Sequence, residues 1–403
     1  MKHLKHLLSI LILGFAFYVP SLMAQDADTG LPKLSAADET RYREILATPV
    51  DPGWLNIKKS QLFREKSVAA AMLGDYQGRE ENLIEWAKID LDGKWNLRGF
   101  LSALGRFEES VKVGNEVIAA EKYAPSAARA RANVAMDYLN INDFSKAEEL
   151  FNSAEKIIRN EFGSVRPGLR SNFFIARAET EVYTKLSIFL MRKGKTEEAL
   201  TFGKLAVEKS KALMKSLDGI DEITYKYNSK ISATQALGNV INQQIGMGQF
   251  VSAEWSLRDA LKFAKENNFN QNNMINFNMI SSDILNGAGR YDQALPYIVS
   301  SQKIHTDQGF PKATSRWMRI RSKELTTLVG LNQWDKALKV LQESYEDAKG
   351  TVYEPKNTLD GKLIGLIQIK NNRIDDAISV LSEAFKNDST NYGPKHYLSL
   401  IHI

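Results

Sequence analysis

The chain has 403 residues, of which 43% are hydrophobic and 25% charged, and its formal net charge is +5 at pH 7, proportions that argue against disorder. Basic and acidic residues are interspersed without a long run of one sign, a pattern typical of solvated helix surfaces and not of a nucleic-acid-binding protein. The absence of cysteine excludes disulfides, thiolate metal sites and a cysteine nucleophile within these residues.

Residues 1–24 have the layout of a secretory signal peptide. Lys2 and Lys5 give a basic start, residues 7–19 form an uncharged apolar run, and Ala24 is a small residue before a polar stretch. The apolar run is short for a membrane span, and no later stretch is apolar enough to be one. We therefore expect an exported protein, periplasmic or secreted; retention of the segment as an uncleaved anchor is the alternative.

Residues 25–53 form a polar lead-in. Ser35 and Asp38 at the start of a short apolar pattern predict one capped helix. Pro49 and Pro52 then end it. The lead-in is therefore expected to carry little structure beyond this helix.

One sequence frame recurs between residues 54 and 397, which we expect to form a single repeat domain. It consists of Gly or Asn, an aromatic or large apolar residue two positions later, a small residue at plus five, a large apolar residue at plus nine and a small residue at plus twelve. Clear copies begin at Asn142, Gly248, Gly289, Asn332 and Asn372, and weaker ones at Gly105 and Gly194. Gly and Asn tolerate the left-handed backbone that ends a helix. The other positions share one helical face, where small residues allow close approach. Each copy therefore predicts a turn and an amphipathic helix, and two antiparallel helices per unit.

The expected helices, in chain order, are 62–73, 83–89, 95–104, 107–119, 126–140, 144–159, 171–192, 196–214, 221–247, 250–266, 272–286, 291–306, 312–329, 334–348, 358–370 and 374–386. No stretch shows the alternation of a strand. The fold class is therefore expected to be all-α.

This frame resembles the tetratricopeptide repeat (TPR) family over roughly residues 55–390. The resemblance implies a right-handed α-solenoid of antiparallel helix pairs wound into a TPR-like superhelix. The copies are spaced further apart than the family's usual ~34 residues, so longer helices are expected. The corners GRYDQAL (289–295) and NQWDKAL (332–338) also resemble those of exported bacterial proteins that join such repeats to a CHAT domain, a caspase-like peptidase fold. That domain would follow residue 403.

In this family the first helix of each pair lines a concave groove that holds an extended peptide or a partner helix. By position in the repeats, the resemblance implies these groove contacts: Arg129, Asn133, Met136, Lys185, Asn239, Asn242, Asn276, Asp283, Arg319 and Lys323. Asparagine offers a donor and an acceptor to a peptide backbone, and Arg or Lys can hold a carboxylate. The predicted partner is a protein or peptide, not a nucleic acid.

The sequence shows no catalytic or metal-binding pattern. HExxH and EF-hand spacings are absent, and we expect no cofactor and no enzyme activity within these residues. His305 is interpreted as a surface or capping residue. The GxG at residues 287–289 and the asparagine-rich stretch 267–273 are interpreted as turns and helix caps.

The C-terminal residues 398–403 would leave an apolar face uncovered, whereas solenoids normally end with a polar capping helix. We therefore expect them to be a non-native tail on the N-terminal part of a longer protein.

Taken with the resemblance, the sequence predicts an exported, non-catalytic protein-interaction scaffold that precedes a CHAT domain. Two alternatives remain open at this point. In the first, the chain is the periplasmic sensor arm of a membrane signalling enzyme, such as a diguanylate cyclase or histidine kinase. In the second, it is a free-standing periplasmic adaptor.

Overall fold

The structure, a computed structural model, describes residues 35–220, 223–307, 312, 314–349, 355 and 359–392. The predicted signal peptide, the first part of the lead-in and the predicted tail lie outside the described residues. Throughout the described ranges the regular structure is helical and contains no strand. The all-α prediction is therefore confirmed. Within the same ranges, no helix combines the length and apolarity needed to cross a membrane.

The chain forms two compact units, which divide in the sequence between Gln243 and Gln244. The helices up to that point are α3 (Ala36–Ala47), α4 (Asn56–Met72), α5 (Tyr76–Ile89), α6 (Leu91–Ala103), α7 (Phe107–Ala120), α8 (Ala124–Asn140), α9 (Phe144–Glu161), α10 (Leu169–Arg192), α11 (Thr196–Lys215) and most of α12 (Ile223–Gly246), with the 3-10 turn η1 (Phe162–Ser164) after α9. The second unit contains α13 (Phe250–Glu266), α14 (Gln271–Gly287), α15 (Tyr291–Asp307), α16 (Ser315–Gly330), α17 (Trp334–Ala348), α19 (Gly361–Lys370) and α20 (Ile374–Tyr392).

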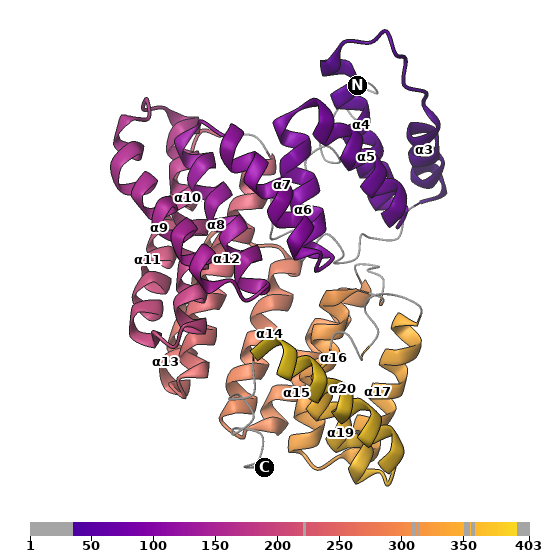
Figure 1. The fold of residues 1–403 in the computed structure, drawn as a ribbon. Helices are drawn as coiled ribbons and strands as arrows, with labels where there is room; N and C mark the ends of the chain where they lie inside the picture. Colours follow the sequence, from indigo (N-terminus) through magenta and orange to yellow (C-terminus); the bar gives the residue numbers. More distant parts are fainter. Residues whose placement is uncertain are drawn as a thin grey trace. The chain divides into compact units, whose positions relative to one another are not determined.

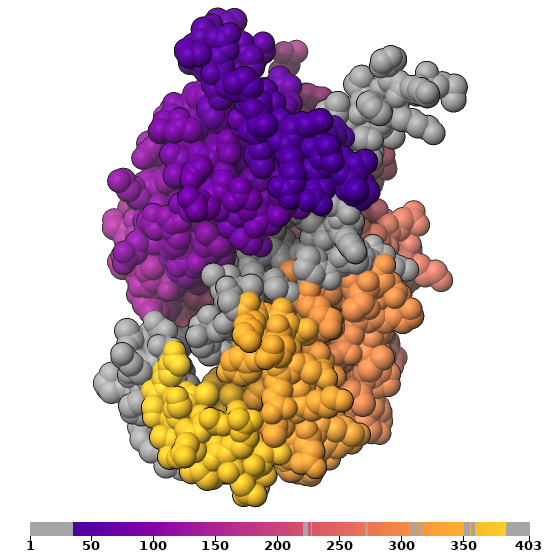
Figure 2. Space-filling model, turned by 90° about the vertical axis from the view of Figure 1, so that its right-hand side faces the viewer, coloured from indigo at the N-terminus to yellow at the C-terminus, as the bar shows by residue number. Residues whose placement is uncertain are grey.

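Within each unit, consecutive helices pair through tight corners (Figure 1). In the first unit α8 packs against α9 and α10 against α11, and α8 and α10, the first helices of these two pairs, also touch each other. In the second unit α14 packs on α15, α16 on α17 and α19 on α20, while α16 touches both α14 and α19. In Figure 2 the yellow C-terminal helices lie beside the orange α16 and α17. Both units are therefore stacks of helix pairs, a TPR-like helical repeat.

The corners are built as the repeat frame predicts. Gly289 and Asn332 have φ angles of 71° and 54°, the left-handed conformation. At the second corner, the N–H of Asn332 donates to the carbonyl of Val329 at 3.0 Å and the N–H of Gln333 to Leu328 at 2.9 Å, which satisfies the last carbonyls of α16. The interpretation of the GxG at 287–289 as a turn is confirmed.

The small residues of the frame lie between packed helices. Ala253, Ala294 and Ala337 are all 0% exposed. The aromatic residue of the frame also packs against a residue without a side chain. Tyr291 lies against Gly330, where an added Cβ would be 2.4 Å from the ring carbons. The stacking of one repeat on the next therefore depends on residues without bulk at fixed positions.

Helix boundaries differ most at the start of the repeats. α5 begins at Tyr76, seven residues before the expected start at 83. The reason is the cap at Asp75, whose carboxylate accepts the N–H of Gly78 at 2.8 Å. Ser35 caps α3 in the same way and confirms the predicted lead-in helix.

Two interpretations of polar residues have opposite outcomes. Asn268 has a left-handed φ of 52°, and the side chain of Asn270 accepts a hydrogen bond from the N–H of Asn273, which confirms the predicted turn and cap.

The interpretation of His305 as a surface or capping residue is wrong. Its side chain is 0% exposed, and its ring lies 5.1 Å from that of Trp317. The apolar face of α15 continues to its last turn, so packing decides the position.

Candidate functional site

The most distinctive group of side chains in the described residues is a buried charge cluster in the first unit. It begins on α10, where Arg177, Glu181 and Lys185 are spaced four residues apart and so lie on one face of the helix. The Nε of Arg177 donates to Oε1 of Glu181 at 2.8 Å. The Nζ of Lys185 lies 3.7 Å from Oε2, an ion pair beyond hydrogen-bond distance. A single carboxylate therefore faces two cations of its own helix.

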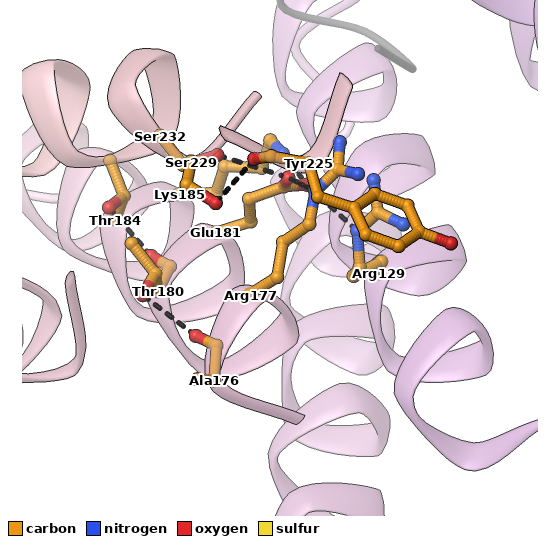
Figure 3. A network of polar contacts seen from close by, with 10 residues as sticks. All are labelled: Arg129, Ala176, Arg177, Thr180, Glu181, Thr184, Lys185, Tyr225, Ser229 and Ser232. Atoms are coloured by element: carbon orange, nitrogen blue, oxygen red, sulfur yellow. Dashed lines mark hydrogen bonds and ion pairs between the residues drawn. The ribbon is translucent and has the colours of Figure 1, made fainter. Parts of the chain in front are cut away.

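Neighbouring helices complete the cluster. Arg129 on α8 donates through Nε to Oε2 of Glu181 at 3.0 Å, and Ser232 on α12 donates to Oε1 at 3.4 Å. Figure 3 shows these side chains converging on Glu181 from three helices. The side chains of Arg129 and Glu181 are each 4% exposed. The cluster therefore joins α8, α10 and α12 inside the unit and not at its surface.

Burial and charge act against each other on Glu181. Desolvation by burial raises the pKa of its carboxyl, but the charges of Arg129, Arg177 and Lys185 lower it more, and the net pKa lies well below the usual range. The carboxyl is therefore ionised at pH 7. It is the negative centre of the cluster.

Lys185 responds in the opposite direction. Burial lowers the pKa of its ammonium from 10.5 to about 8, because the attraction of Glu181 only partly offsets desolvation and the repulsion from Arg129, Arg98 and Arg177. The ammonium is therefore still largely protonated at pH 7. Keeping such a cation in the interior costs several kcal/mol unless partners compensate it.

A second buried ion pair lies next to this cluster. Arg98 on α6 donates through Nε to Oδ2 of Asp137 on α8 at 2.9 Å, and through Nη2 to the carbonyl of Asn133 at 2.7 Å. The hydroxyls of Ser102 and Ser110 donate to the same carboxylate at 2.6 and 2.8 Å. The Asp137 carboxylate therefore pairs with one cation and accepts from two hydroxyls. The Glu181 carboxylate, in contrast, forms ion pairs with three cations.

The structure brings together some of the predicted groove residues of the first unit. Arg129 and Lys185 meet at Glu181, and Asn133 contacts Arg98. All three are buried, at 3%, 4% and 0% exposure. Their predicted role as contacts of a peptide on the surface of a groove stays a prediction, and their present contacts are with other side chains of the chain.

The two predicted residues on α12 are more accessible. Asn239 is half-buried and donates through Nδ2 to Oγ of Ser187 on α10 at 2.5 Å. Asn242 is exposed on the same helix. The predicted Met136, on α8, is half-buried against the main core of the unit.

In the second unit the predicted residues lie on α14 and α16. Lys323 and Asp283 form an ion pair of 2.7 Å between these two helices. Burial raises the pKa of the Asp283 carboxyl more than Lys323 lowers it. Asn276 is half-buried and Arg319 exposed. These four residues therefore do not form one cluster comparable to that of Glu181.

The central residues of the buried cluster were not among those predicted from the sequence. Glu181 and Arg177 could have been found together with Lys185, since the spacing Arg-x3-Glu-x3-Lys is an i, i+4 pattern within one helix. Arg98 and Asp137 carry no local signal, because they are brought together from different helices.

The second unit also contains a hollow of about 740 Å³ between α16, α17, α19 and α20. Its lining pairs cations with carboxylates: Arg321 lies 2.9 Å from Glu343 and 3.6 Å from Asp347. The charges here are balanced, so the lining does not favour a ligand of either sign. Across the described ranges no group of three or more His, Asp or Glu side chains is arranged to hold a metal ion.

No protein-family model matches the sequence, and no curated protein matches it. Among solved structures, the chain is similar to a signal transduction ATPase with numerous domains (STAND) protein with a tetratricopeptide repeat sensor from Pyrococcus horikoshii. The TM-score is 0.48 and the identity 13%, over 91% of this chain and 54% of that one. It is also similar to RapI in its apo form, with a TM-score of 0.47 and 11% identity over 86% of each chain. A Rap protein complexed with competence and sporulation factor gives a TM-score of 0.46 and 12% identity, over 87% of this chain and 96% of that one. The chain thus spans about half the length of the first of these proteins.

Proposed function

We propose that the chain is a protein-interaction scaffold without catalytic chemistry of its own, and that it binds an extended peptide along the first helices of its repeats. The observation that carries the proposal is the polar pair on α12. Asn239 uses its amide N–H₂ on Ser187, which leaves its amide oxygen as an acceptor, and Asn242 is exposed one turn further on. Paired amides of this kind match the alternating donors and acceptors of a peptide backbone.

The test is peptide binding by the purified chain. An array of random peptides identifies the tightest ligand, and its affinity is then measured for an Asn239→Ala, Asn242→Ala double variant. We expect a loss of about tenfold or more, the equivalent of one or two hydrogen bonds. The matched control is Asn152→Ala, an exposed asparagine on α9, a second helix of its pair. Equal affinity of the double variant and the control would refute the assignment of these residues.

We also propose that the protein is exported, on the pattern of Lys2, Lys5, the apolar run at residues 7–19 and Ala24. A fusion to an enzyme that is active only outside the cytoplasm tests this, together with sequencing of the mature N-terminus. Activity of the fusion and a new terminus at Gln25 are expected. Activity with an intact N-terminus would identify a retained anchor, and an inactive fusion would contradict export.

For the larger context, we propose that these repeats form the N-terminal arm of a CHAT-domain protein, on the resemblance of the corners at 289–295 and 332–338. The gene sequence after codon 403 tests this directly. A soluble domain with a cysteine and a histidine is expected. A membrane-spanning run followed by a signalling domain, or a polar capping helix followed by a stop codon, would replace the proposal by one of the two alternatives.

A further inference from the structure

We propose that the Glu181 cluster is a binding site for a small oxyanion, of the class of inorganic phosphate, sulfate or a small carboxylate, bound between α6, α8 and α10. The inference is independent of the peptide-binding proposal. It uses only side chains of the first unit.

The cationic donors near Glu181 outnumber the acceptors that the described residues give them. Within the described part of the chain, Arg98 Nη1, Arg129 Nη2 and Lys185 Nζ are buried and have no hydrogen-bond acceptor. The three side chains are 1%, 4% and 5% exposed. Buried donors are nearly always satisfied in folded proteins, and charged donors most of all. Three cationic donors from three different helices therefore point to an acceptor that the chain itself does not provide.

Glu181 does not use the full pairing capacity of the cations around it. Its Oε2 accepts from Arg129 Nε at 3.0 Å, and the same oxygen lies 3.7 Å from Lys185 Nζ. Arginine pairs best with an anion through two parallel N–H groups, and Arg129 presents only one of them to the carboxylate. Its Nη2 and the Lys185 ammonium are left for a second set of oxygen atoms.

Positive charge exceeds negative charge around Glu181. Glu181 is the single carboxylate in ion-pair contact with Arg129 and Lys185 among the described residues. The neighbouring Arg98 is already paired, with Asp137, yet it still repels Lys185 strongly enough to contribute to its lowered pKa. A bound anion would compensate this excess, and an anion with several oxygens could accept from Arg98, Arg129 and Lys185 together.

The chemistry of the site selects against other ligands. The unused groups are all donors, so a cation or a neutral acceptor-poor molecule is not recognised. Because the surrounding side chains are buried, the ligand is small. Entry requires local opening of the helix pairs, so binding is expected to be slow to equilibrate.

The experiment measures thermal unfolding of the full chain at pH 7 after prolonged incubation with sodium phosphate, sulfate or acetate, and with sodium chloride at the same ionic strength. We expect a saturable rise in Tm with at least one oxyanion above that given by chloride. If phosphate and sulfate raise the Tm and acetate does not, the ligand is a tetrahedral oxyanion. If acetate raises the Tm and the other two do not, the ligand is a carboxylate.

Two variants locate the effect. Lys185→Met and Arg129→Met are expected to weaken anion binding by about tenfold each, as measured by calorimetric titration. Lys211→Met, which removes an exposed lysine from α11, is the matched control and should bind like the unchanged chain. If Arg129→Met does not fold, Lys185→Met alone gives the answer. The proposal is overturned if no oxyanion exceeds chloride, or if Lys185→Met and Lys211→Met respond to the anion alike.

Discussion

Arg98 and Asp137 form an ion pair in which both side chains are 1% exposed, with Nε of the arginine 2.9 Å from Oδ2 of the aspartate. The pair connects α6 to α8, helices of successive pairs in the first unit. It holds an arginine in the interior that would otherwise be among the least favourable residues to bury. Its strength can therefore be tested by removing the carboxylate charge alone.

Replacing Asp137 by Asn is expected to lower the free energy of unfolding by about 3–5 kcal/mol, because the guanidinium stays buried without a counter-charge. Urea denaturation followed by circular dichroism measures this. Glu85→Gln, which breaks the exposed pair with Lys88 on α5, serves as the control and should leave the stability nearly unchanged. Similar losses for the two variants would show that the buried pair is not special.

Replacing Lys185 by Met is expected to stabilise the protein at pH 7 in oxyanion-free buffer, by about 1–3 kcal/mol, because a buried ammonium without a hydrogen bond is removed. Arg129 and Arg177 still compensate Glu181 in this variant. Lys211→Met should have no such effect. A loss of stability in Lys185→Met would mean that the 3.7 Å contact with Glu181 contributes more than desolvation costs.

The lowered pKa of Lys185 also predicts that the free energy of unfolding depends on pH in the alkaline range. Its folded pKa of about 8 lies below the unfolded value of 10.5, so between these values the unfolded chain binds more protons and the stability rises with pH. The difference between the unfolding free energies of the unchanged chain and Lys185→Met, measured from pH 7 to 10.5, isolates this contribution from other titrating groups. The gap in favour of the variant should shrink as pH rises. A constant gap would show that Lys185 titrates normally.

Glu181 predicts that the free energy of unfolding also depends on pH in the acid range. Here the pKa shift comes from neighbouring cations and not from burial. Its pKa is lowered in the folded state, so its stabilisation is present above the unfolded pKa near 4.5 and is lost as pH falls towards the folded value. Glu181→Gln should be less stable than the unchanged chain at pH 7, and the two should converge below pH 4.5. Parallel curves over this range, measured by urea denaturation, would exclude a special role for the carboxylate.

The contact of Gly330 with Tyr291 predicts a clash between neighbouring repeats. Ala is normally the better helix residue, but its Cβ would lie 2.4 Å from the ring, so Gly330→Ala should lower the free energy of unfolding by about 1–3 kcal/mol. In a Tyr291→Ala background the same change should be neutral or stabilising by up to about 1 kcal/mol. A double-mutant cycle on unfolding free energies checks the coupling. Additive effects would contradict the packing described here.

Much of the fold could be predicted because its signals are local. The left-handed residue at a corner such as Asn332 and the small residue at Ala337 act within a few positions of one another, and each has one dominant physical reason. The start of α5 at Tyr76 was missed because its first turns are polar, and only the cap by Asp75 shows that they are helical. In the candidate site, Arg129 and Lys185 were predicted as groove contacts, and that role stays a prediction; their burial at Glu181 has no local signal in the sequence.

The sequence by itself determined the repeating helix pairs, their corners and the small-residue faces by which they pack, because these follow from backbone conformation and helical periodicity over a dozen residues. Only the tertiary structure decided that Arg129 and Lys185 are buried at Glu181 beside Arg98. Their solvation and charge balance depend on three helices that are distant in sequence, and exclusion of water is what makes unused cationic donors significant.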